Sequence, residues 1–440
     1  MALAPFSSAT AEPRIDLDAI DHRDGALERV EAERLARWAP DTFLESLVVL
    51  SNGDLLIPDA IGHDILRATP SGDVSVFFSG DISPMGLAIS IDNTVIATGR
   101  DGQDQWNIFV FAPTGELRTS IPVADAEGLN GATFLTPTVV LANDATIGRI
   151  FRIDLETNSV TTWHEHALYQ RDPEQSELIP GINGIKISKG AAYISNTSQM
   201  TILRTPLEGP DFAAGEPEIL HRDLIIDDFS IAADGTIYGT THIYNTVVRI
   251  EPDGGLTRIA TTEDGVEGST ATAFGRSAND AAHLYVVGDG GFYLDPENAN
   301  EAFLVRLDVN DPGLSIAASF DHIPYPGKIE TPPAALVTCS TAPGKNAARK
   351  RAAPQYTRFL ELNAPRIMMA GQVTTEVGAP PSARQYVFRG MSVGEAETLM
   401  RASPYFVAGV YARCEGTVFT PMAGDLLGGV AWGDSVSQSD

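Results

Sequence analysis

The stretch Ala191-Ala-Tyr-Ile-Ser195 decides the fold, because short runs of the same kind recur five more times along the chain. The other copies are Asp54-Leu-Leu-Ile57, Thr94-Val-Ile-Ala97, Thr138-Val-Val-Leu141, Thr236-Ile-Tyr-Gly239 and His283-Leu-Tyr-Val-Val287. Successive copies start 40, 44, 53, 45 and 47 residues apart. A spacing of this size is typical of repeats in which each unit is one four-stranded antiparallel sheet.

Each copy is followed by a second strand-like run, and five of these six runs carry an Arg at or near the same place. The second runs are Asp64-Ile-Leu-Arg67, Asn107-Ile-Phe-Val-Phe111, Gly148-Arg-Ile-Phe-Arg-Ile153, Thr201-Ile-Leu-Arg204, Thr246-Val-Val-Arg-Ile250 and Phe303-Leu-Val-Arg-Leu307. Such small sheets bury both faces only by packing radially on one another. We therefore expect a mainly β fold, a six-bladed β-propeller over residues 39–317. Tandem βαβ units are the alternative, but the sequence lacks the helical patterns that they need between strands.

Net charge divides the chain. Residues 331–440 contain 10 Lys+Arg and 8 Asp+Glu, so the remaining 20 basic and 50 acidic residues give the first 330 residues a charge of −30. The shift coincides with the Pro-rich stretch 323–333, which predicts a linker at 318–333. Before the propeller we expect a leader, residues 1–38, with a helix over 25–38. After the linker we expect a small α+β domain at 334–425 and a tail at 426–440.

Composition limits the partners and the compartment. The net charge of −28 repels a phosphate backbone and gains nothing from an anionic membrane surface, so we expect neither nucleic-acid nor membrane binding. No apolar run approaches the ~18 residues of a membrane span, and the N-terminus lacks the features of a secretory signal. The cysteines, Cys339 and Cys414, are too few for a disulfide framework. A reducing, cytoplasmic location is the expectation.

Register within the repeats brings polar residues to one end of the central channel. Counting back eight or nine residues from each run reaches the start of the innermost strand of its blade. Those positions hold Glu45, Met85, Asn130, Asn183, Asp227 or Asp228, and Ser269 or Thr270. Carboxylate and amide oxygens without His or Cys suit one hard divalent cation, Ca²⁺. Asn-Gly pairs are also common turn residues, which is the alternative explanation for Asn130 and Asn183.

The loops after the second strands open at the same end, because the innermost strand runs away from the site and the next strand returns. These loops carry His63, Arg100, Asp144, Asn196 and His242. We expect these side chains, together with Asn130, to contact the substrate. The sequence contains no Gly-x-Ser-x-Gly elbow, phosphate-binding loop or zinc-ligand spacing, so serine-hydrolase, nucleotide and zinc chemistry lack support.

Four motifs resemble those of the SMP-30/gluconolactonase-like six-bladed propellers, over roughly residues 40–310. The motifs are Phe43-Leu-Glu-Ser-Leu-Val-Val-Leu-Ser-Asn-Gly53, Gly181-Ile-Asn-Gly-Ile185, Asp227-Asp-Phe-Ser-Ile-Ala-Ala-Asp-Gly235 and Gly268-Ser-Thr-Ala-Thr-Ala-Phe-Gly-Arg276. The resemblance implies a divalent cation held by Glu45, Asn183 and Asp227, with Asn130 as a further site residue. Asp228 replaces the family's Gly, so Asp227 and Asp228 are both candidates for the catalytic base. The last two motifs look most like a branch that includes hetero-Diels-Alderases of natural-product pathways.

Residues 334–422 have the pattern β-α-β-β-α-β, which predicts a ferredoxin-like α+β domain. We expect strands at 334–339, 367–373, 385–390 and 416–421, a helix over 355–363, and a second helix from Ser392 with a Ser392–Glu395 capping box. The run 392–411 resembles a YCII-related (dimeric α+β barrel) domain. That family's site His and Asp are replaced here, since no His follows His322 and Ser403 precedes Pro404. We expect a structural role and a homodimer formed through this domain.

Three functions remain open. The first is a metal-dependent hydrolase of a lactone or related cyclic ester, with Asp227 or Asp228 as base. The second is a pericyclase or cyclase that orients a reactive polyene in the same pocket without metal chemistry. The third is a binding scaffold without chemistry, which leaves the register of acids and amides unexplained. For the two enzymes the expected substrate is a small neutral organic molecule.

Overall fold

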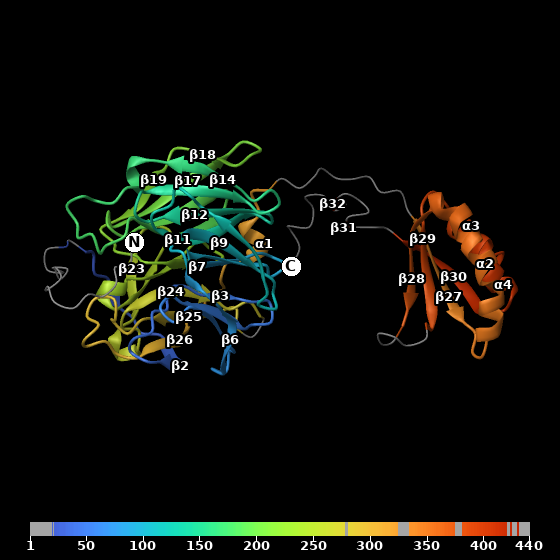
Figure 1. Ribbon diagram of the computed structural model, residues 1–440, viewed down its shortest axis with the longest axis horizontal. Helices are drawn as coiled ribbons and strands as arrows, with labels where there is room; N and C mark the ends of the chain where they lie inside the picture. The colour runs from blue at the N-terminus through green and yellow to red at the C-terminus, as the bar shows by residue number, and fades with distance from the viewer. Residues whose placement is uncertain are drawn as a thin grey trace. The chain divides into compact units, whose positions relative to one another are not determined.

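The structure is a computed structural model that describes residues 20, 22–277, 280–323, 334–374, 381–419, 423–424 and 429–430. It divides into two compact units, Met1–Ile323 and Pro324–Asp440. Strands dominate both units, which confirms the predicted mainly β class (Figure 1). No helix in these described ranges is long and apolar enough to cross a membrane.

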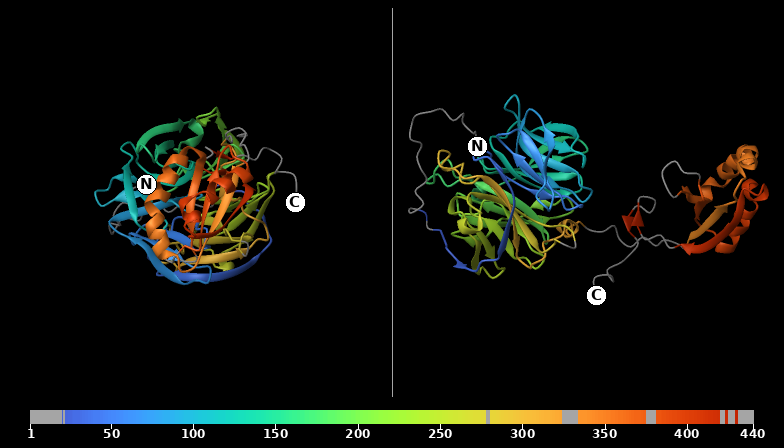
Figure 2. Two further views of the ribbon diagram at one scale, coloured as in Figure 1. Left: turned by 90° about the vertical axis from the view of Figure 1, so that its right-hand side faces the viewer. Right: turned by 90° about the horizontal axis from the view of Figure 1, so that it is seen from below.

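The first unit contains six sheets of four or five strands, numbered here in chain order (Figure 2). Sheet 1 comprises β3 (Val48–Val49), β4 (Leu55–Asp59), β5 (Asp64–Ala68) and β6 (Val74–Ser79). Sheet 2 comprises β7 (Ile82–Ile89), β8 (Val95–Asp101), β9 (Trp106–Phe111) and β10 (Leu117–Pro122). Sheet 3 comprises β11 (Leu129–Thr136), β12 (Val139–Asp144), β13 (Arg149–Asp154) and β14 (Ser159–Glu165).

The remaining three sheets repeat this order, with additions at their outer edges. Sheet 4 comprises β15 (Ile182–Ser188), β16 (Ala191–Asn196), β17 (Thr201–Glu208), β18 (Ala213–Ala214) and β19 (Glu218–Arg222). Sheet 5 comprises β20 (Phe229–Ile231), β21 (Ile237–Thr240), β22 (Val247–Ile250), β23 (Leu256–Ala260) and β1 (Ala26–Leu27). Sheet 6 comprises β24 (Ser269–Phe274), β25 (His283–Gly288), β26 (Ala302–Asp308) and β2 (Glu31–Trp38). Single-turn helices η2 (Ala167–Tyr169), η3 (His242–Tyr244) and η4 (Thr262–Asp264) lie in loops.

The repeated runs of the sequence form equivalent strands. The six first runs lie on the second strands of the sheets, and the six second runs lie on the third strands. The first strands contact one another in a closed cycle, from β3 through β7, β11, β15, β20 and β24 back to β3. Apolar side chains fill the spaces between neighbouring sheets, as where Ile96 and Ile108 of sheet 2 share a core with Phe134 of sheet 3. The ring therefore positions the start of each first strand near its centre.

The expected leader helix is wrong, because residues 26–27 and 31–38 are strands β1 and β2. β2 pairs antiparallel with β26, with Glu31 opposite Asp308 and Trp38 opposite Ala302. The helical spacing of this segment is overridden because pairing satisfies the free backbone groups at the edge of β26. The N-terminal segment thus closes the ring by completing its last sheet.

The first unit also extends further than residue 317. Helix α1 (Ile316–Ser319) is followed by Phe320, which packs against the core of sheets 2 and 3. His322 Nε2 donates a hydrogen bond to the Leu135 carbonyl oxygen at 2.8 Å. These contacts correct the expected linker start at 318, and the rest of that linker, 324–333, lies outside the described residues.

The second unit is one antiparallel sheet with helices on one face (Figure 1). Its elements are β27 (Ala334–Thr341), α2 (Asn346–Asn363), η5 (Ala364–Arg366), β28 (Ile367–Val373), β29 (Ala383–Phe388), α3 (Val393–Arg401), α4 (Pro404–Val407) and β30 (Tyr411–Phe419). The strand order is β28-β29-β27-β30. The Ser392–Glu395 capping box is present. Helix α2 begins nine residues before the expected 355, since Pro354 is accommodated inside it. In the expected tail, Gly429–Val430 form β32, which pairs with β31 (Ala423–Gly424).

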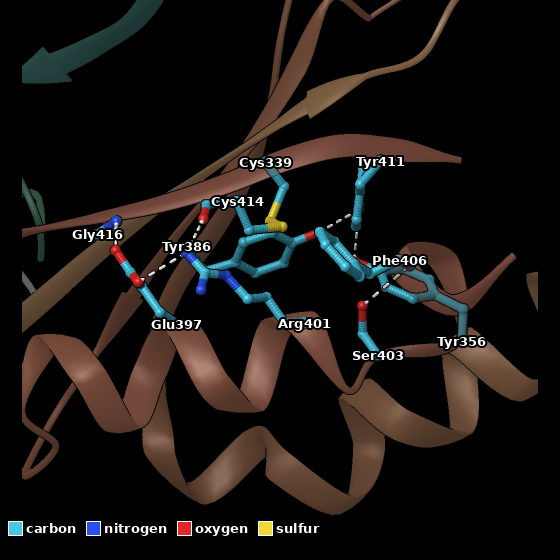
Figure 3. Close-up of a disulfide and its surroundings, with 10 residues drawn as sticks. All are labelled: Cys339, Tyr356, Tyr386, Glu397, Arg401, Ser403, Phe406, Tyr411, Cys414 and Gly416. Atoms are coloured by element: carbon cyan, nitrogen blue, oxygen red, sulfur yellow. Dashed lines mark hydrogen bonds and ion pairs between the residues drawn. A yellow bond between two sulfur atoms is a disulfide. The ribbon is translucent and has the colours of Figure 1, made fainter. Parts of the chain in front are cut away.

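A disulfide joins Cys339 of β27 to Cys414 of β30, two residues that lie directly opposite each other in the sheet (Figure 3). It corrects the expectation of two thiols, because strand pairing brings together residues that are 75 positions apart in the sequence. Beside it, the buried hydroxyl groups of Tyr356, Tyr386 and Tyr411 hydrogen-bond one another. Disulfides are rare in reducing compartments. The bond weighs against the predicted cytoplasmic location, which stays a prediction.

Candidate functional site

Glu45, Met85, Asn130, Asn183 and Asp227 line one cavity of about 60 Å³ in the first unit. Each comes from a different sheet and from the beginning, or just before the beginning, of its first strand. The sixth predicted position does not reach the cavity. There, the Ser269 hydroxyl donates to the Thr246 carbonyl and the Thr270 hydroxyl to the Leu44 carbonyl, so both are fully buried structural groups.

The two carboxylates each accept a hydrogen bond from an amide of another sheet. Asn130 Nδ2 donates to Glu45 Oε1 at 2.9 Å, and Asn183 Nδ2 donates to Asp227 Oδ1. Asn183 Nδ2 also lies 3.4 Å from Thr197 Oγ1. Glu45 is 8% exposed, Asp227 5% and Asn183 2%, so this is an acid and amide cluster withdrawn from water.

The Asn-Gly pairs are not turns. Gly131 and Gly184 lie inside β11 and β15. A Cβ atom on Gly131 would lie 2.2 Å from the Asn183 carbonyl oxygen, and one on Gly184 would lie 3.0 Å from the Asp228 Cα. Glycine is therefore needed where the first strands of neighbouring sheets approach each other most closely. The turn explanation for Asn130 and Asn183 does not hold.

A repeated hydrogen bond fixes the backbone of the site residues. The second strand of one sheet carries a small polar side chain that donates to the carbonyl oxygen at the site position of the next sheet. Thr98 Oγ1 reaches Asn130 at 2.6 Å, Asn143 Nδ2 reaches Asn183 at 2.9 Å, Ser195 Oγ reaches Asp227 at 2.7 Å, and Thr240 Oγ1 reaches Thr270 at 2.7 Å. The site geometry is therefore held by contacts between sheets, and not by any one loop.

His242 lies between two buried carboxylates. Its Nδ1 is 3.0 Å from Asp227 Oδ2, and its Nε2 is 3.3 Å from Asp289 Oδ2. Asp289 is fully buried and accepts further hydrogen bonds from the backbone N–H groups of Gly291 and Tyr293. His242 has φ of 45°, in the left-handed region that non-glycine residues rarely adopt. Such strain persists where surrounding contacts over-determine a conformation, and it concentrates at functional sites.

Burial and mutual repulsion change the protonation of this cluster. Burial, together with the nearby Asp227 charge, raises the pKa of Glu45 to about 8. Burial also raises the pKa of Asp227, although His242 opposes that shift. Burial alone would lower the pKa of His242, but the carboxylates of Asp289 and Asp227 outweigh it and hold that pKa well above 6.5. His242 is therefore a cation at neutral pH, while Glu45 gains a proton unless another positive charge arrives.

The donor set fits a hard divalent cation. A cavity of about 60 Å³ has the volume of about two waters, at ~30 Å³ per water. Glu45 and Asp227 supply two carboxylates, and rotation of the Asn130 and Asn183 amide groups would present their oxygens in place of Nδ2. Within the part of the chain that the structure describes, no cluster of three or more His, Cys, Asp or Glu side chains could hold a metal ion. Amide oxygens and water would have to complete the shell, as Ca²⁺ sites permit.

Asp228 is separated from the cavity that Asp227 lines. Its Oδ1 is 2.6 Å from Lys186 Nζ, and it is absent from the cavity wall. Consecutive residues of an extended segment point to opposite sides, which is why only one of the two carboxylates enters the site.

The five predicted rim residues have different surroundings. Asp144 and Asn196 are fully buried loop supports: Asp144 accepts from the Gly128 N–H at 3.1 Å, and Asn196 donates to the Leu168 carbonyl at 2.9 Å. His63 is exposed and bonded to the Ile82 carbonyl. Arg100 pairs with Asp104 and stacks over Trp106, which lines the cavity. Only His242 of this group lines the cavity itself.

Asp289, Tyr293 and Trp106 were not predicted as site residues. Asp289 directly follows β25, so it occupies in sheet 6 the place that the rim residues occupy in the other sheets. Extending the repeat to its sixth copy would have found it. The apolar walls also come from Phe43, Ile225 and Ile243. Their contribution carries no sequence signal because apolar residues are equally common in the core.

A hydrogen bond between two loops covers the cavity. Tyr293, from the loop after β25, donates from its hydroxyl to the Leu178 carbonyl in the loop before β15, at 2.8 Å. Both residues line the cavity. An organic substrate needs more room than about 60 Å³, since pockets for such ligands are typically ~300 Å³ or larger. Substrate entry would require these two loops to separate.

Comparisons with solved structures find β-propeller proteins. A luciferin-regenerating enzyme is 12% identical, with a TM-score of 0.49, over 65% of this chain and 98% of that one. A calcium-binding regucalcin from Agrobacterium tumefaciens is 16% identical, with a TM-score of 0.48, over 66% and 98%. A gluconolactonase from Xanthomonas campestris is 14% identical, with a TM-score of 0.48, over 66% and 91%. No protein-family model and no curated protein sequence matches the chain.

Proposed function

We propose that the six sheets are the blades of a six-bladed β-propeller of the SMP-30/gluconolactonase-like kind. The closed cycle of contacts among the first strands supports this interpretation. For the second unit we propose a ferredoxin-like α+β domain of the YCII-related kind, supported by the strand order β28-β29-β27-β30.

For the activity we propose metal-dependent hydrolysis of a lactone or related cyclic ester at the cavity that Glu45 and Asp227 line. The observation that carries this proposal is the convergence of two buried carboxylates and two amides from four sheets. Buried carboxylates whose mutual repulsion raises a pKa to about 8 are relieved by a divalent cation. When bound there, Ca²⁺ would polarise the ester carbonyl and acidify a water molecule.

The residues of the chain would then move the proton. Asp227 accepts a proton from the attacking water as the water oxygen bonds to the carbonyl carbon. The ring C–O bond breaks, and that proton passes to the leaving alkoxide oxygen, which gives a hydroxy acid. His242 holds Asp227 in one orientation by donating from Nδ1, and Asp289 keeps His242 protonated from the other side. Tyr293 and Leu178 exclude bulk water when the covering loops are together.

A lactone panel assayed with and without chelator tests this proposal. Wild-type protein should hydrolyse at least one lactone, lose the activity in EDTA and recover it with Ca²⁺. Glu45→Gln and Asp227→Asn should lose activity, whereas Glu116→Gln, at an exposed position in the loop between β9 and β10, should retain it. Full lactonase activity in metal-stripped protein would contradict the mechanism.

A pericyclase or cyclase is the second candidate, favoured by one observation. Phe43, Met85, Trp106, Leu129 and Tyr293 give the cavity largely apolar walls, which suit a polyene. This activity would proceed by orientation and be insensitive to EDTA. It leaves the buried carboxylates without a role, so the hydrolase is our first proposal.

We also propose a homodimer formed through the second unit. Met369 and Val373 are 51% and 37% exposed on the sheet face opposite the helices. Pairing of two such faces would cover them. Sedimentation velocity on the full chain should give a dimer that Met369→Glu converts to a monomer; a monomeric wild type would contradict the proposal.

A further inference from the structure

A second, larger cavity lies in the first unit, with a volume of about 450 Å³. Its wall includes residues from the first strands of all six sheets, but from positions further along each strand than the candidate site. On β15, Asn183 lines the first cavity and Lys186 the second; on β11, Asn130 lines the first and Thr133 the second. Three residues of strand span ~10 Å, so the two cavities occupy successive levels of the same channel.

The segment Gly313–His322, here called the strap, closes the far side of this cavity. At its start, the backbone N–H of Leu314 donates to the Ile231 carbonyl of sheet 5 at 2.9 Å. At its end, His322 bonds to the Leu135 carbonyl of sheet 3 at 2.8 Å. Helix α1 lies between these two anchors, and Ile316 and Phe320 of the strap face the cavity (Figure 1). The strap therefore crosses from one side of the ring to the other and encloses the space.

The chemistry of the wall is apolar and cationic. Its aliphatic and aromatic side chains include Leu47, Leu87, Phe134 and Ile187. Lys186 and Arg276 are its charged residues, and no Asp or Glu is among the described residues that line it. The first 330 residues carry a net charge of −30, so a wall with only positive charges is unlike the rest of this unit.

Arg276 differs from Lys186 in lacking a carboxylate partner. Lys186 is paired with Asp228 at 2.6 Å. Half-buried Arg276 donates from Nη1 to the Val49 carbonyl and to Asn93 Oδ1, and it forms no ion pair with the described residues. A guanidinium withdrawn from water is stabilised when it meets a carboxylate, which it binds with two parallel hydrogen bonds.

We propose that the strap cavity binds a small apolar carboxylate, with its chain against the aliphatic wall and its head group on Arg276. Its volume lies within the ~300–1,000 Å³ range of small-molecule sites. The positive wall disfavours a cationic ligand, and the apolar wall disfavours a strongly hydrated one such as phosphate. Binding here is independent of the proposed lactonase activity, because the wall does not include Glu45, Asp227 or His242.

Isothermal titration calorimetry with octanoate, and with 1-octanol as its uncharged counterpart, tests the proposal on the full chain. Octanoate should bind wild-type protein about tenfold more tightly than octanol, which is the magnitude expected for one charge-assisted interaction. Arg276→Gln should remove this difference and leave octanol binding unchanged. Ala88→Met, which fills the cavity from β7, should weaken both ligands.

A control separates the two cavities. Glu45→Gln alters the candidate site alone, so octanoate should bind this variant as it binds the wild type. Equal affinity for octanoate and octanol in wild-type protein would overturn the proposal without any variant. So would octanoate binding that survives Arg276→Gln unchanged, or that disappears in Glu45→Gln.

Discussion

The raised pKa of Glu45 has a measurable consequence for stability. Its carboxyl group has a pKa of about 8 in the folded protein against an ordinary 4.5, because of burial and the Asp227 charge. Between these two values the folded state holds a proton that the unfolded state has released, so the free energy of unfolding falls as pH rises. At 1.36 kcal/mol per pKa unit, the full loss is about 5 kcal/mol. The stabilisation is complete below pH 4.5 and is lost as pH rises to about 8.

Glu45→Gln should remove this pH dependence, because an amide is uncharged throughout the range. In EDTA, denaturant unfolding at pH 5 should show similar stabilities for the variant and the wild type. At pH 9 the variant should be more stable by about 5 kcal/mol. Exposed Glu116 supplies the matched control, since Glu116→Gln should follow the wild-type curve.

Added Ca²⁺ should restore wild-type stability at pH 9 by binding the ionised carboxylate, and should stabilise Glu45→Gln less. A difference between wild type and Glu45→Gln that stays constant from pH 5 to pH 9 in EDTA would refute the assignment of Glu45 as a buried acid beside Asp227.

Three further predictions concern the supports of the two units. Gly131→Ala should destabilise the protein by about 1–3 kcal/mol in denaturant titrations, because the new methyl group meets the Asn183 carbonyl; Gly371→Ala, in open space, should have little effect. Asp289→Asn should lower kcat/KM for the hydrolysed lactone about 10–100-fold while circular dichroism stays unchanged, since it removes a charge that holds His242 in place. Cys339→Ser should destabilise the second unit by about 4 kcal/mol, and thiol titration of unfolded, unreduced wild-type protein should find no free thiol; two reactive thiols would contradict the disulfide.

Local pattern was sufficient for the parts of the fold that depend on one repeat at a time. The spacing of runs such as Ala191–Ser195 located the second strand of every sheet. Counting back from these runs identified Glu45, Asn130, Asn183 and Asp227, which converge on one cavity. The register works because side chains alternate along a strand, so a fixed offset returns the same face in each repeat.

Local pattern failed where a partner distant in sequence decided the structure. Residues 31–38 have helical spacing, yet they form a strand because β26 presents an unpaired edge. Cys339 and Cys414 form a disulfide because β27 and β30 pair in a register that places them opposite each other. Asp228 is indistinguishable from Asp227 in the sequence, and Lys186 on a neighbouring sheet holds it away from the cavity.

The sequence by itself determined the mainly β class, the repeat and the four acids and amides of the candidate site. The tertiary structure alone decided which of these groups are buried together, that His242 lies between Asp227 and Asp289, and that a strap encloses a second cavity. The physical reason is that a strand pattern specifies which face a side chain occupies. Closure of the ring specifies what that side chain meets, and burial and charge at that meeting point set its chemistry.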